Sequence, residues 1–467
     1  MQLATDAPIG MGVELSASDR AAAAATTNIA GRLERLPMSR YQRKIFAIIA
    51  SAWLVDQVDV ALLTFLLGSI VVAFGLTPIE AGQLAAMTFA GQLIGNVIAG
   101  TASDRFGRKT VFQVTMLVWG FASLAAAAAW SLTALMVCRF LIGVGVGGEA
   151  PVAQALVSEF VPAKVRGRYI AIMEGFWAVG FVLSGAISYA LLPQLGWRSV
   201  FVTVGLLAVL VFWVRRLVPE SPRWLAQQGR LVEADRIVTG LEHAIRSEQG
   251  DTLPAPAVSV HETSNDSPWT TLAEAPYAGR AAMACGMWFF ALLGYFGLSS
   301  WLTLLLQAKG FSLVKSVGFV TLITTGGIPG FAAAAWLLEA VGRKPTTAAF
   351  LLASAAAAYL YGASSTSTSL FIAGFTMQFF MFGMWSCLYA YTPELFPTRA
   401  RATGAGLASA VGRVGAIAGP MIVGATVKSF GQPAVFALGA GSFVLASVLV
   451  LSLGIETRGR TLEAIAS

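Results

Sequence analysis

A succession of long apolar stretches, many of them 18 residues or more, constrains the fold of this chain more than any other feature of its sequence. A helix needs about 20 residues to cross the hydrocarbon core of a bilayer. Only 12% of the residues are charged, against roughly 25% in an average soluble domain, which is too few to cover a surface that faces water. The sequence therefore predicts an all-α membrane protein with many spans.

Gly, Pro and charged residues mark the ends of twelve expected spans. They lie at 45–74, 80–102, 111–130, 133–158, 169–192, 197–217, 280–308, 314–339, 347–363, 369–393, 404–428 and 432–454. With the N-terminus in the cytoplasm, most of the 31 Lys and Arg residues face the cytoplasm, two lie within spans, and four lie outside, namely Arg198, Lys309, Lys315 and Lys428. This skew follows the positive-inside rule for an inner (plasma) membrane protein with both termini cytoplasmic. It also explains the net charge of +7 without a nucleic-acid partner.

The chain is expected to divide into five segments. They are a cytoplasmic N-terminal segment at 1–44, a first six-helix bundle at 45–217, a cytoplasmic linker with short helices at 218–279, a second six-helix bundle at 280–454 and a cytoplasmic tail at 455–467. The first forty residues lack the apolar run and cleavage site of a secretory signal peptide. The first span is therefore expected to act as its own insertion signal.

The two halves of six spans are related in sequence. An offset of 235 takes Asp104, Gly107, Arg108 and Lys109 to Glu339, Gly342, Arg343 and Lys344, and takes Glu159, Pro162 and Arg166 to Glu394, Pro397 and Arg401. One offset fits two separate loops and equals about half the chain, as a duplicated unit requires. Two such halves can rock about a shared interface and expose one central site to either side of the membrane.

Four motifs resemble those of the major facilitator superfamily. They are Gly100-Thr-Ala-Ser-Asp104-Arg105-Phe-Gly107-Arg108-Lys109, Arg139-Phe-Leu-Ile-Gly143-Val-Gly145-Val-Gly147-Gly148, Pro219-Glu220-Ser221-Pro222-Arg223-Trp224 and Pro393-Glu394-Leu395-Phe396-Pro397-Thr398-Arg399. Together they resemble the sugar-porter clan and, within it, the synaptic-vesicle-two-related and metabolite:proton symporter branches, from about the first span to Thr461. The resemblance implies twelve transmembrane helices in two six-helix bundles related by a pseudo-two-fold axis.

The resemblance also assigns a gate to the charged residues near the cytoplasmic helix ends. In the superfamily the loop after the second span latches against a helix terminus of the other half when the inner gate is shut, and carboxylates favour helix N-termini. A single exposed ion pair contributes only ~0–1 kcal/mol, so a network would be needed to bias the equilibrium between states; alternatively these charges only orient the chain. The gating set is Asp104, Arg105, Arg108, Arg139, Glu159, Arg166, Glu220, Arg223, Glu339, Arg343, Glu394 and Arg399.

Four acids lie inside the expected spans and are candidates for proton coupling: Asp56, Asp59, Glu149 and Glu174. A charge at the bilayer centre costs roughly 2.5–3.5 kcal/mol, so each is expected to face the bundle interior. Asp56 and Asp59 share a helix face, and one of two close carboxylates can hold a proton near neutral pH. Asp56-Gln57-Val58-Asp59 resembles the D-G-x-D motif of proton symporters for aromatic acids, without its Gly. The alternative is a structural, hydrogen-bonded pair.

Arg413 lies in a Gly-rich eleventh span, which faces the other half in the superfamily. Its guanidinium could hold a substrate carboxylate through two parallel hydrogen bonds, or it could neutralise one of the intramembrane acids. Aromatic residues are dense in the seventh and tenth spans; most are expected to pack or to face lipid, and a few to line the site. The candidate substrate-binding residues are Arg413, Asp56, Asp59, Trp177, Tyr295, Trp385 and Tyr389.

The resemblance implies proton-coupled symport of a small organic anion. The stretch Met173-Glu174-Gly-Phe-Trp177 and the apolar seventh span look most like bacterial nicotinate carriers, which implies an aromatic monocarboxylate such as nicotinate. Sugar porters typically carry Gln residues in the fifth and seventh spans, and their replacement here argues against a sugar. The alternatives are an exporter of organic cations or drugs, a sugar or polyol porter, or a non-transporting ligand sensor on the same fold.

Other chemistry finds little support in the sequence. Cys138, Cys285 and Cys387 have no metal-ligand spacing, and both histidines fall in one polar stretch, so carboxylates would have to carry any proton inside the membrane. The sequence contains no nucleotide-binding loop, which argues against an ATP-driven pump. It also contains no nucleophile–base spacing, which argues against an enzyme. We therefore expect no cofactor, no metal and no nucleic-acid partner, and a monomer that acts on a small molecule and protons within a lipid bilayer.

Overall fold

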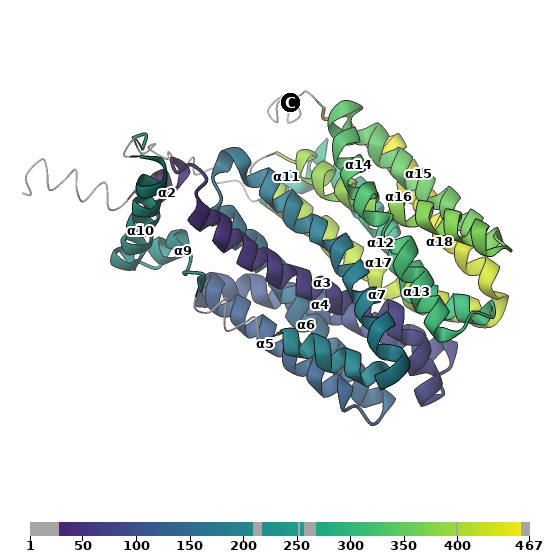
Figure 1. Ribbon diagram of the computed structural model, residues 1–467. Helices are drawn as coiled ribbons and strands as arrows, with labels where there is room; N and C mark the ends of the chain where they lie inside the picture. The colour runs from purple at the N-terminus through teal and green to yellow at the C-terminus, as the bar shows by residue number, and fades with distance from the viewer. Residues whose placement is uncertain (1–27, 209–216, 251–252, 256–267, 398–399, 459–467) are drawn as a thin grey trace, which may run out of the picture.

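The computed structural model describes residues 28–208, 217–250, 253–255, 268–397 and 400–458, and the regular structure in these ranges is α-helical. Figure 1 shows two helical bundles side by side. The first contains α3 (Arg40–Phe74), α4 (Pro78–Phe106), α5 (Arg108–Ala127), α6 (Leu132–Phe160) and α7 (Ala163–Leu207). The second contains α12 (Tyr277–Ala308), α13 (Leu313–Thr324), α14 (Gly327–Ala340), α15 (Arg343–Ala363), α16 (Ser367–Glu394), α17 (Arg401–Phe430) and α18 (Gln432–Leu453).

The predicted fold of twelve spans in two bundles is confirmed. Eleven stretches of described residues are long and apolar enough to cross a membrane, and one of them holds two spans. That one is α7, in which Gly196 adopts a φ of 73° and separates the fifth span from the sixth. Residues 209–216 of the predicted sixth span lie outside the described residues. α13 and α14 follow one another with a short break and together form the eighth span.

The first span begins five residues before its predicted start, inside the predicted N-terminal segment. Ser39 caps α3 by accepting a hydrogen bond from the backbone N–H of Gln42, whose side chain accepts one from the backbone N–H of Ser39 at 2.9 Å. This reciprocal cap satisfies two backbone donors that a helix start leaves free. The same Gln42 donates to the carbonyl oxygen of Phe160 at 2.8 Å, which ties the start of α3 to the end of α6.

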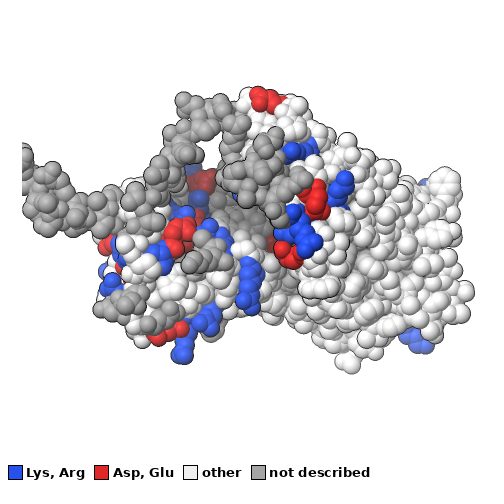
Figure 2. All heavy atoms as spheres, turned by 90° about the horizontal axis from the view of Figure 1, so that it is seen from above, with Lys and Arg blue, Asp and Glu red and all other residues white. Residues whose placement is uncertain are grey.

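Charged side chains gather at one end of the molecule, as Figure 2 shows. We call this the charged end and define it as the end of both bundles where α4, α6, α14 and α16 finish, at Phe106, Phe160, Ala340 and Glu394. The broad surface beyond it carries few charges in this view. An uncharged belt beside a charged end is what a membrane-embedded helical protein requires, because lipid cannot solvate charged groups.

The two bundles touch backbone to backbone near the opposite end, where α4 begins and α17 approaches its last turns. A Cβ added to Gly82 would lie 2.6 Å from the carbonyl oxygen of Pro420, and one added to Gly424 would lie 2.5 Å from that of Pro78. Glycine is required at both places because any side chain would push the two helices apart. The halves are therefore closed against each other at this end.

Short helices outside the two bundles form a small assembly at the charged end of the first bundle. α2 (Ile29–Glu34) packs against α9 (Pro222–Gln227) and α10 (Leu231–Gln249), and Ile29 and Leu33 are buried in a shared apolar cluster. A last short helix, α11 (Pro268–Ala273), precedes α12. The sequence analysis did not predict α2; the only local signal is Asn28, whose side chain accepts a hydrogen bond from the backbone N–H of Gly31 at 2.9 Å.

Glu242 of α10 holds α2 in place. Arg32 donates to its two carboxylate oxygens at 3.0 and 2.9 Å, and Arg35 pairs with it at 2.6 Å. Burial alone would raise the pKa of Glu242, but the hydrogen bonds and charges of these two arginines outweigh it and hold the pKa below its usual value. The stabilisation is therefore present above the ordinary carboxyl pKa and is lost as the pH falls through the lowered value.

We predict that Glu242→Gln releases α2. The substitution removes the carboxylate that Arg35 pairs with and leaves Arg32 with Asp235 as its remaining ion-pair partner, and the loss of a charged hydrogen bond costs about 2 kcal/mol. Hydrogen exchange of the backbone amides of 29–34 should speed up at neutral pH. Glu233→Gln is the matched control, because its pair with Arg230 is exposed to solvent. Equal protection of α2 in the two variants would show that Glu242 does not hold it.

Candidate functional site

A buried ion pair lies inside the first bundle, between α3 and α6. The guanidinium of Arg139 is 3.1 Å from the carboxylate of Asp59, and the two side chains are 1% and 0% exposed. The hydroxyl of Ser123 on α5 donates to the other carboxylate oxygen of Asp59, and the ring of Phe201 lies 5.9 Å from the guanidinium. Arg139 therefore lies deep in the bundle and away from the charged end, where the other described gating residues lie.

The glycines of the fourth-span motif let three helices approach this ion pair closely. A Cβ on Gly143 or Gly147 would lie 2.1 or 2.3 Å from carbonyl oxygens of α4, and a Cβ on Gly145 would lie 2.7 Å from a carbonyl oxygen of α5. Glycines two residues apart thus face different neighbours. Small residues of this kind are how membrane helices pack tightly without a hydrophobic driving force.

Asp56 and Asp59 have different immediate neighbours, although they share a helix face as predicted. Asp56 lies beside Glu149 of α6, close enough for their carboxyl groups to share a hydrogen bond. Both side chains are fully buried, and the indole of Trp119 lies beside Glu149 as well. Two carboxyl groups in this arrangement repel each other unless one of them carries a proton.

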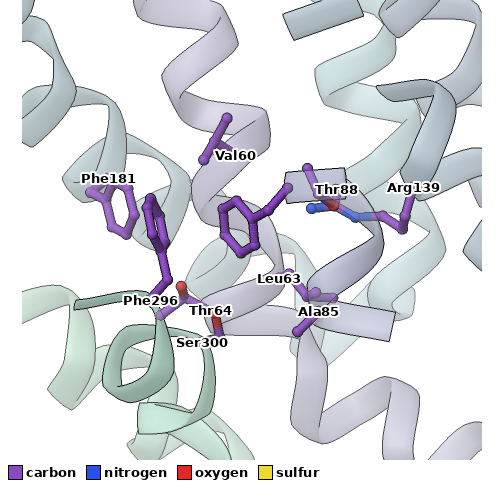
Figure 3. Close-up of a pocket in the computed structure, with 10 residues that line it drawn as sticks. Val60, Leu63, Thr64, Ala85, Thr88, Arg139, Phe181, Phe296 and Ser300 are labelled. Atoms are coloured by element: carbon purple, nitrogen blue, oxygen red, sulfur yellow. The ribbon is translucent and has the colours of Figure 1, made fainter. Parts of the chain in front are cut away.

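A small pocket lies where these helices meet the second bundle. Arg139, Thr88 and Phe89 line it from the first bundle, and Phe296 and Ser300 of α12 line it from the second. Figure 3 shows Arg139 reaching toward Thr88 on one side, with the ring of Phe296 on the other. It has room for about one water molecule, and the Thr88 hydroxyl has no partner among the described residues.

The four predicted aromatic residues come together at the interface between the bundles. The indole N–H of Trp177 on α7 donates to the hydroxyl of Tyr295 on α12 at 3.1 Å. The ring centroids of Trp177 and Trp385 are 5.1 Å apart, and the ring of Tyr389 stacks on Trp385 at 5.8 Å. The sequence analysis did not single out three further rings that join this cluster, those of Phe181, Phe296 and Phe382.

Arg413 lies at the same interface, and its partner is an amide. Its Nη1 donates to the side-chain oxygen of Gln92 on α4, while its buried Nε has no partner among the described residues. Of the four intramembrane acids, Glu174 is the one that interacts with it electrostatically, as does the ring hydroxyl of Tyr389. Glu174 is 5% exposed and accepts a hydrogen bond from Gln154 at 2.9 Å.

The two halves repeat one ion-pair pattern at the charged end. In each half an arginine at the start of one helix pairs with an acid four residues earlier and with a second acid from another helix. The pairs are Arg108–Asp104 (2.9 Å), Arg108–Glu159 (3.5 Å), Arg343–Glu339 (2.9 Å) and Arg343–Glu394 (3.1 Å). The offset of 235 residues thus relates side-chain contacts as well as sequence, and each of these networks stays within one half.

A further acid in each half caps the helix that follows the glycine turn. Glu220 accepts from the backbone N–H of Lys109 at 3.0 Å, and Glu456 accepts from that of Lys344 at 3.1 Å. Gly107 and Gly342 have φ values of 96° and 131°. The sequence analysis missed Glu456. The signal was present, since Glu456 follows the twelfth span as Glu220 follows the sixth, at an offset of 236 residues, one more than the main repeat.

The remaining gating residues either lie at the charged end of the first half or fall outside the described residues. Glu34 of α2 pairs with Arg166 at 3.3 Å and with Arg223. Arg105 is exposed, with its guanidinium 5.3 Å from the ring centroid of Phe106. Arg399 lies outside the described residues.

The comparisons with known proteins all find transporters. The family described as sugar (and other) transporter matches residues 45–467. The chain is 37% identical over 440 residues to the niacin transporter NiaP of Acinetobacter baylyi, covering 94% of this chain and 99% of that protein. It is 30% identical over 393 residues to the 4-hydroxybenzoate transporter PcaK of the same species, covering 83% and 85%. The solved structure of the xylose transporter XylE from E. coli, partially occluded and inward open, has a TM-score of 0.72 at 19% identity, covering 91% of this chain and 100% of that one.

We predict that Asp59→Asn destabilises the protein strongly, because it leaves the guanidinium of Arg139 buried without a counter-charge. Breaking a buried ion pair in this way costs about 3–5 kcal/mol. Thermal unfolding of the purified protein in detergent should show a large fall in melting temperature, most of it recovered in the double variant Asp59→Asn/Arg139→Gln. Asp104→Asn is the control, because that carboxylate is 74% exposed. If the double variant were no more stable than Asp59→Asn, the pair would not hold this part of the bundle.

Proposed function

This chain belongs to the sugar (and other) transporter family, and we propose that it is a proton-coupled symporter that carries a small organic anion, with nicotinate as the best-supported substrate. It is a membrane transporter for a small molecule and not an enzyme, as its relatives and its fold establish. The proposal concerns the coupling ion, the substrate and the residues that bind them.

One observation carries the choice of an aromatic anion: a buried arginine whose partner is an amide lies beside a cluster of aromatic rings. The charge of the Arg413 guanidinium is not cancelled by its amide partner, and its Nε–H has no partner in the part of the chain that the structure describes, which suits a carboxylate bound through parallel hydrogen bonds. Trp177, Trp385 and Tyr389 offer faces and edges against which a flat ring can stack. The two relatives named for aromatic acids, niacin and 4-hydroxybenzoate, support the same substrate class.

Glu174 supplies a physical reason for coupling the anion to a proton. An ionised carboxylate beside Arg413 would offset the charge that attracts the substrate, whereas a protonated Glu174 leaves the site with a net positive charge. Proton and anion then favour each other's binding, and this mutual dependence is reciprocal by thermodynamic linkage. The substrate carboxylate and the transported proton enter a membrane site together as a nearly neutral pair.

The other buried acids give the carrier a second place to hold a proton. In this proposal Asp56 and Glu149, two buried carboxyl groups that lie side by side, share one proton because both cannot be ionised together. A proton on Asp59 would release Arg139 from its ion pair. Either change alters charge within the first bundle, next to the pocket at the interface.

Alternating access follows from two bundles that close at one end and keep separate ion-pair networks at the other. In this proposal the charged end is cytoplasmic, both termini lie there, and the protein works as a monomer in the bacterial inner membrane. The networks around Arg108 and Arg343 then hold the helix ends of each half while the halves move against each other.

We predict that purified protein in liposomes takes up labelled nicotinate when a proton gradient is imposed and stops when a protonophore removes the gradient. Symport requires this dependence because the proton and the anion cross together. Liposomes without protein are the control for passive entry of the neutral acid. Uptake at an unchanged rate after the gradient is removed would contradict proton coupling.

We also predict distinct effects for substitutions of the two charged site residues. Arg413→Gln should weaken nicotinate binding by about 10–100-fold, the worth of hydrogen bonds to a charged group. Arg413→Lys should restore only part of it, because an ammonium cannot form the two parallel bonds. Calorimetry on purified protein measures both.

Glu174→Gln imitates the protonated acid, so nicotinate binding should persist and lose its dependence on pH, while accumulation against a gradient fails. Binding that still strengthens at low pH in this variant would place the coupling proton elsewhere.

A further inference from the structure

A hydrogen bond between the two halves links Arg413 to a residue that the sequence analysis did not consider. Gln92 is on α4 of the first half and is 2% exposed, whereas Arg413 is on α17 of the second half. The Nη1 of Arg413 donates to the side-chain oxygen of Gln92. Along both helices, the contact lies between the close backbone approaches at Gly82 and Gly424 and the charged end.

Packing against α6 fixes the backbone that carries Gln92. A Cβ on Gly147 would lie 2.4 Å from the Cα of Gln92, and a Cβ on Gly91 would lie 2.1 Å from the carbonyl oxygen of Phe140. The two helices therefore touch along their backbones on both sides of this residue. Gln92 starts from a rigid position in the first half, and its side chain reaches across the interface to the second half.

An amide is a particular choice of partner for a guanidinium. Its oxygen accepts a hydrogen bond and carries no net charge, so the positive charge of Arg413 is solvated without being cancelled. A carboxylate at the same place would form an ion pair and compete with any anionic ligand. Glu174, the acid that interacts with Arg413, already accepts a hydrogen bond from Gln154, and Tyr389 is a neutral phenol.

The edges of the guanidinium are used unequally. Gln92 occupies Nη1, while the buried Nε–H has no partner among the described residues. A buried donor without an acceptor is unfavourable, so this edge is available to a ligand. A carboxylate that binds side-on to Nε and Nη2 would satisfy it and leave the contact with Gln92 intact.

We infer that Gln92 is a positioning residue of the anion site: it holds one edge of Arg413 through an uncharged contact from the opposite half and so turns the Nε edge toward the substrate carboxylate. The inference rests on the proposed function, because it assigns the carboxylate to Arg413. It adds that the site is complete only when both halves contribute, so that binding depends on how the halves are placed.

The test compares Gln92→Met, which removes the acceptor at similar size, with Gln92→Glu, which keeps it and adds a charge. Each is made alone and together with Arg413→Gln. Nicotinate affinity should fall about tenfold or more for each single variant, since a hydrogen bond to a charged group is lost or an internal anion competes. In the Arg413→Gln background Gln92→Met should not weaken binding further, because the contact that it removes is already absent. Gln83→Glu and Gln83→Met, on the same helix, are the controls and should bind as the unaltered protein does.

A structural role alone gives a different pattern. If Gln92 only packed α4 against its neighbours, its substitution would weaken binding equally with and without Arg413, and that result would overturn the inference. Binding at the unaltered affinity in Gln92→Met would overturn it as well.

Thermal unfolding without ligand separates this inference from the proposed function. If the unaltered protein binds neither nicotinate nor benzoate, the proposed function fails. The effects of Gln92→Met and Arg413→Gln on melting temperature then decide whether Gln92 holds Arg413. If the two effects on melting temperature are not additive, the contact is supported. If they are additive, the contact is refuted.

Discussion

A charged side chain can remain inside a bilayer only where another part of the protein takes the place of water, and the centre of this molecule is organised around that requirement. Four of the buried charged groups meet it in different ways. Asp59 and Arg139 form an ion pair with a hydroxyl attached, Glu174 accepts from an amide, and Arg413 donates to one. The arrangement around Arg413 combines a positive charge, an uncharged partner and a buried Nε–H without a partner among the described residues, which is why we propose it as the anion site.

The duplicated architecture explains why the charged end is built twice. The ion pairs around Arg108 and Arg343 correspond residue by residue, and each is completed by an acid that caps the following helix, Glu220 in one half and Glu456 in the other. Each half therefore holds its own helix ends through contacts within that half. Two units that are internally held in this way can change their relative position while their own contacts persist.

Much of the fold could be predicted from sequence, because apolar length, the positive-inside skew and one repeat offset each depend on the chain alone. The site was only partly accessible. The aromatic residues and Arg413 were identified by residue type and span, and the structure brings them together. The neighbours of Asp56 and Arg413 depend on how helices rotate and cross, so Glu149 and Gln92 had no pattern in the sequence to mark them as partners. α2 is six residues long, too short for a periodic signal, and its docking depends on charges more than 200 residues away.

The close backbone approaches at Gly82 and Gly424 have a mechanical consequence. They bring α4 and α17 together backbone to backbone, so this contact can act as a pivot whose position side-chain rearrangement hardly alters. From Gly424 back to Arg401 the helix extends about 35 Å at 1.5 Å per residue. A tilt of about 10° at the pivot would displace the far end of α17 by roughly 6 Å over such a length, so a modest rotation at one membrane face is enough to admit or enclose a molecule of one aromatic ring at the other.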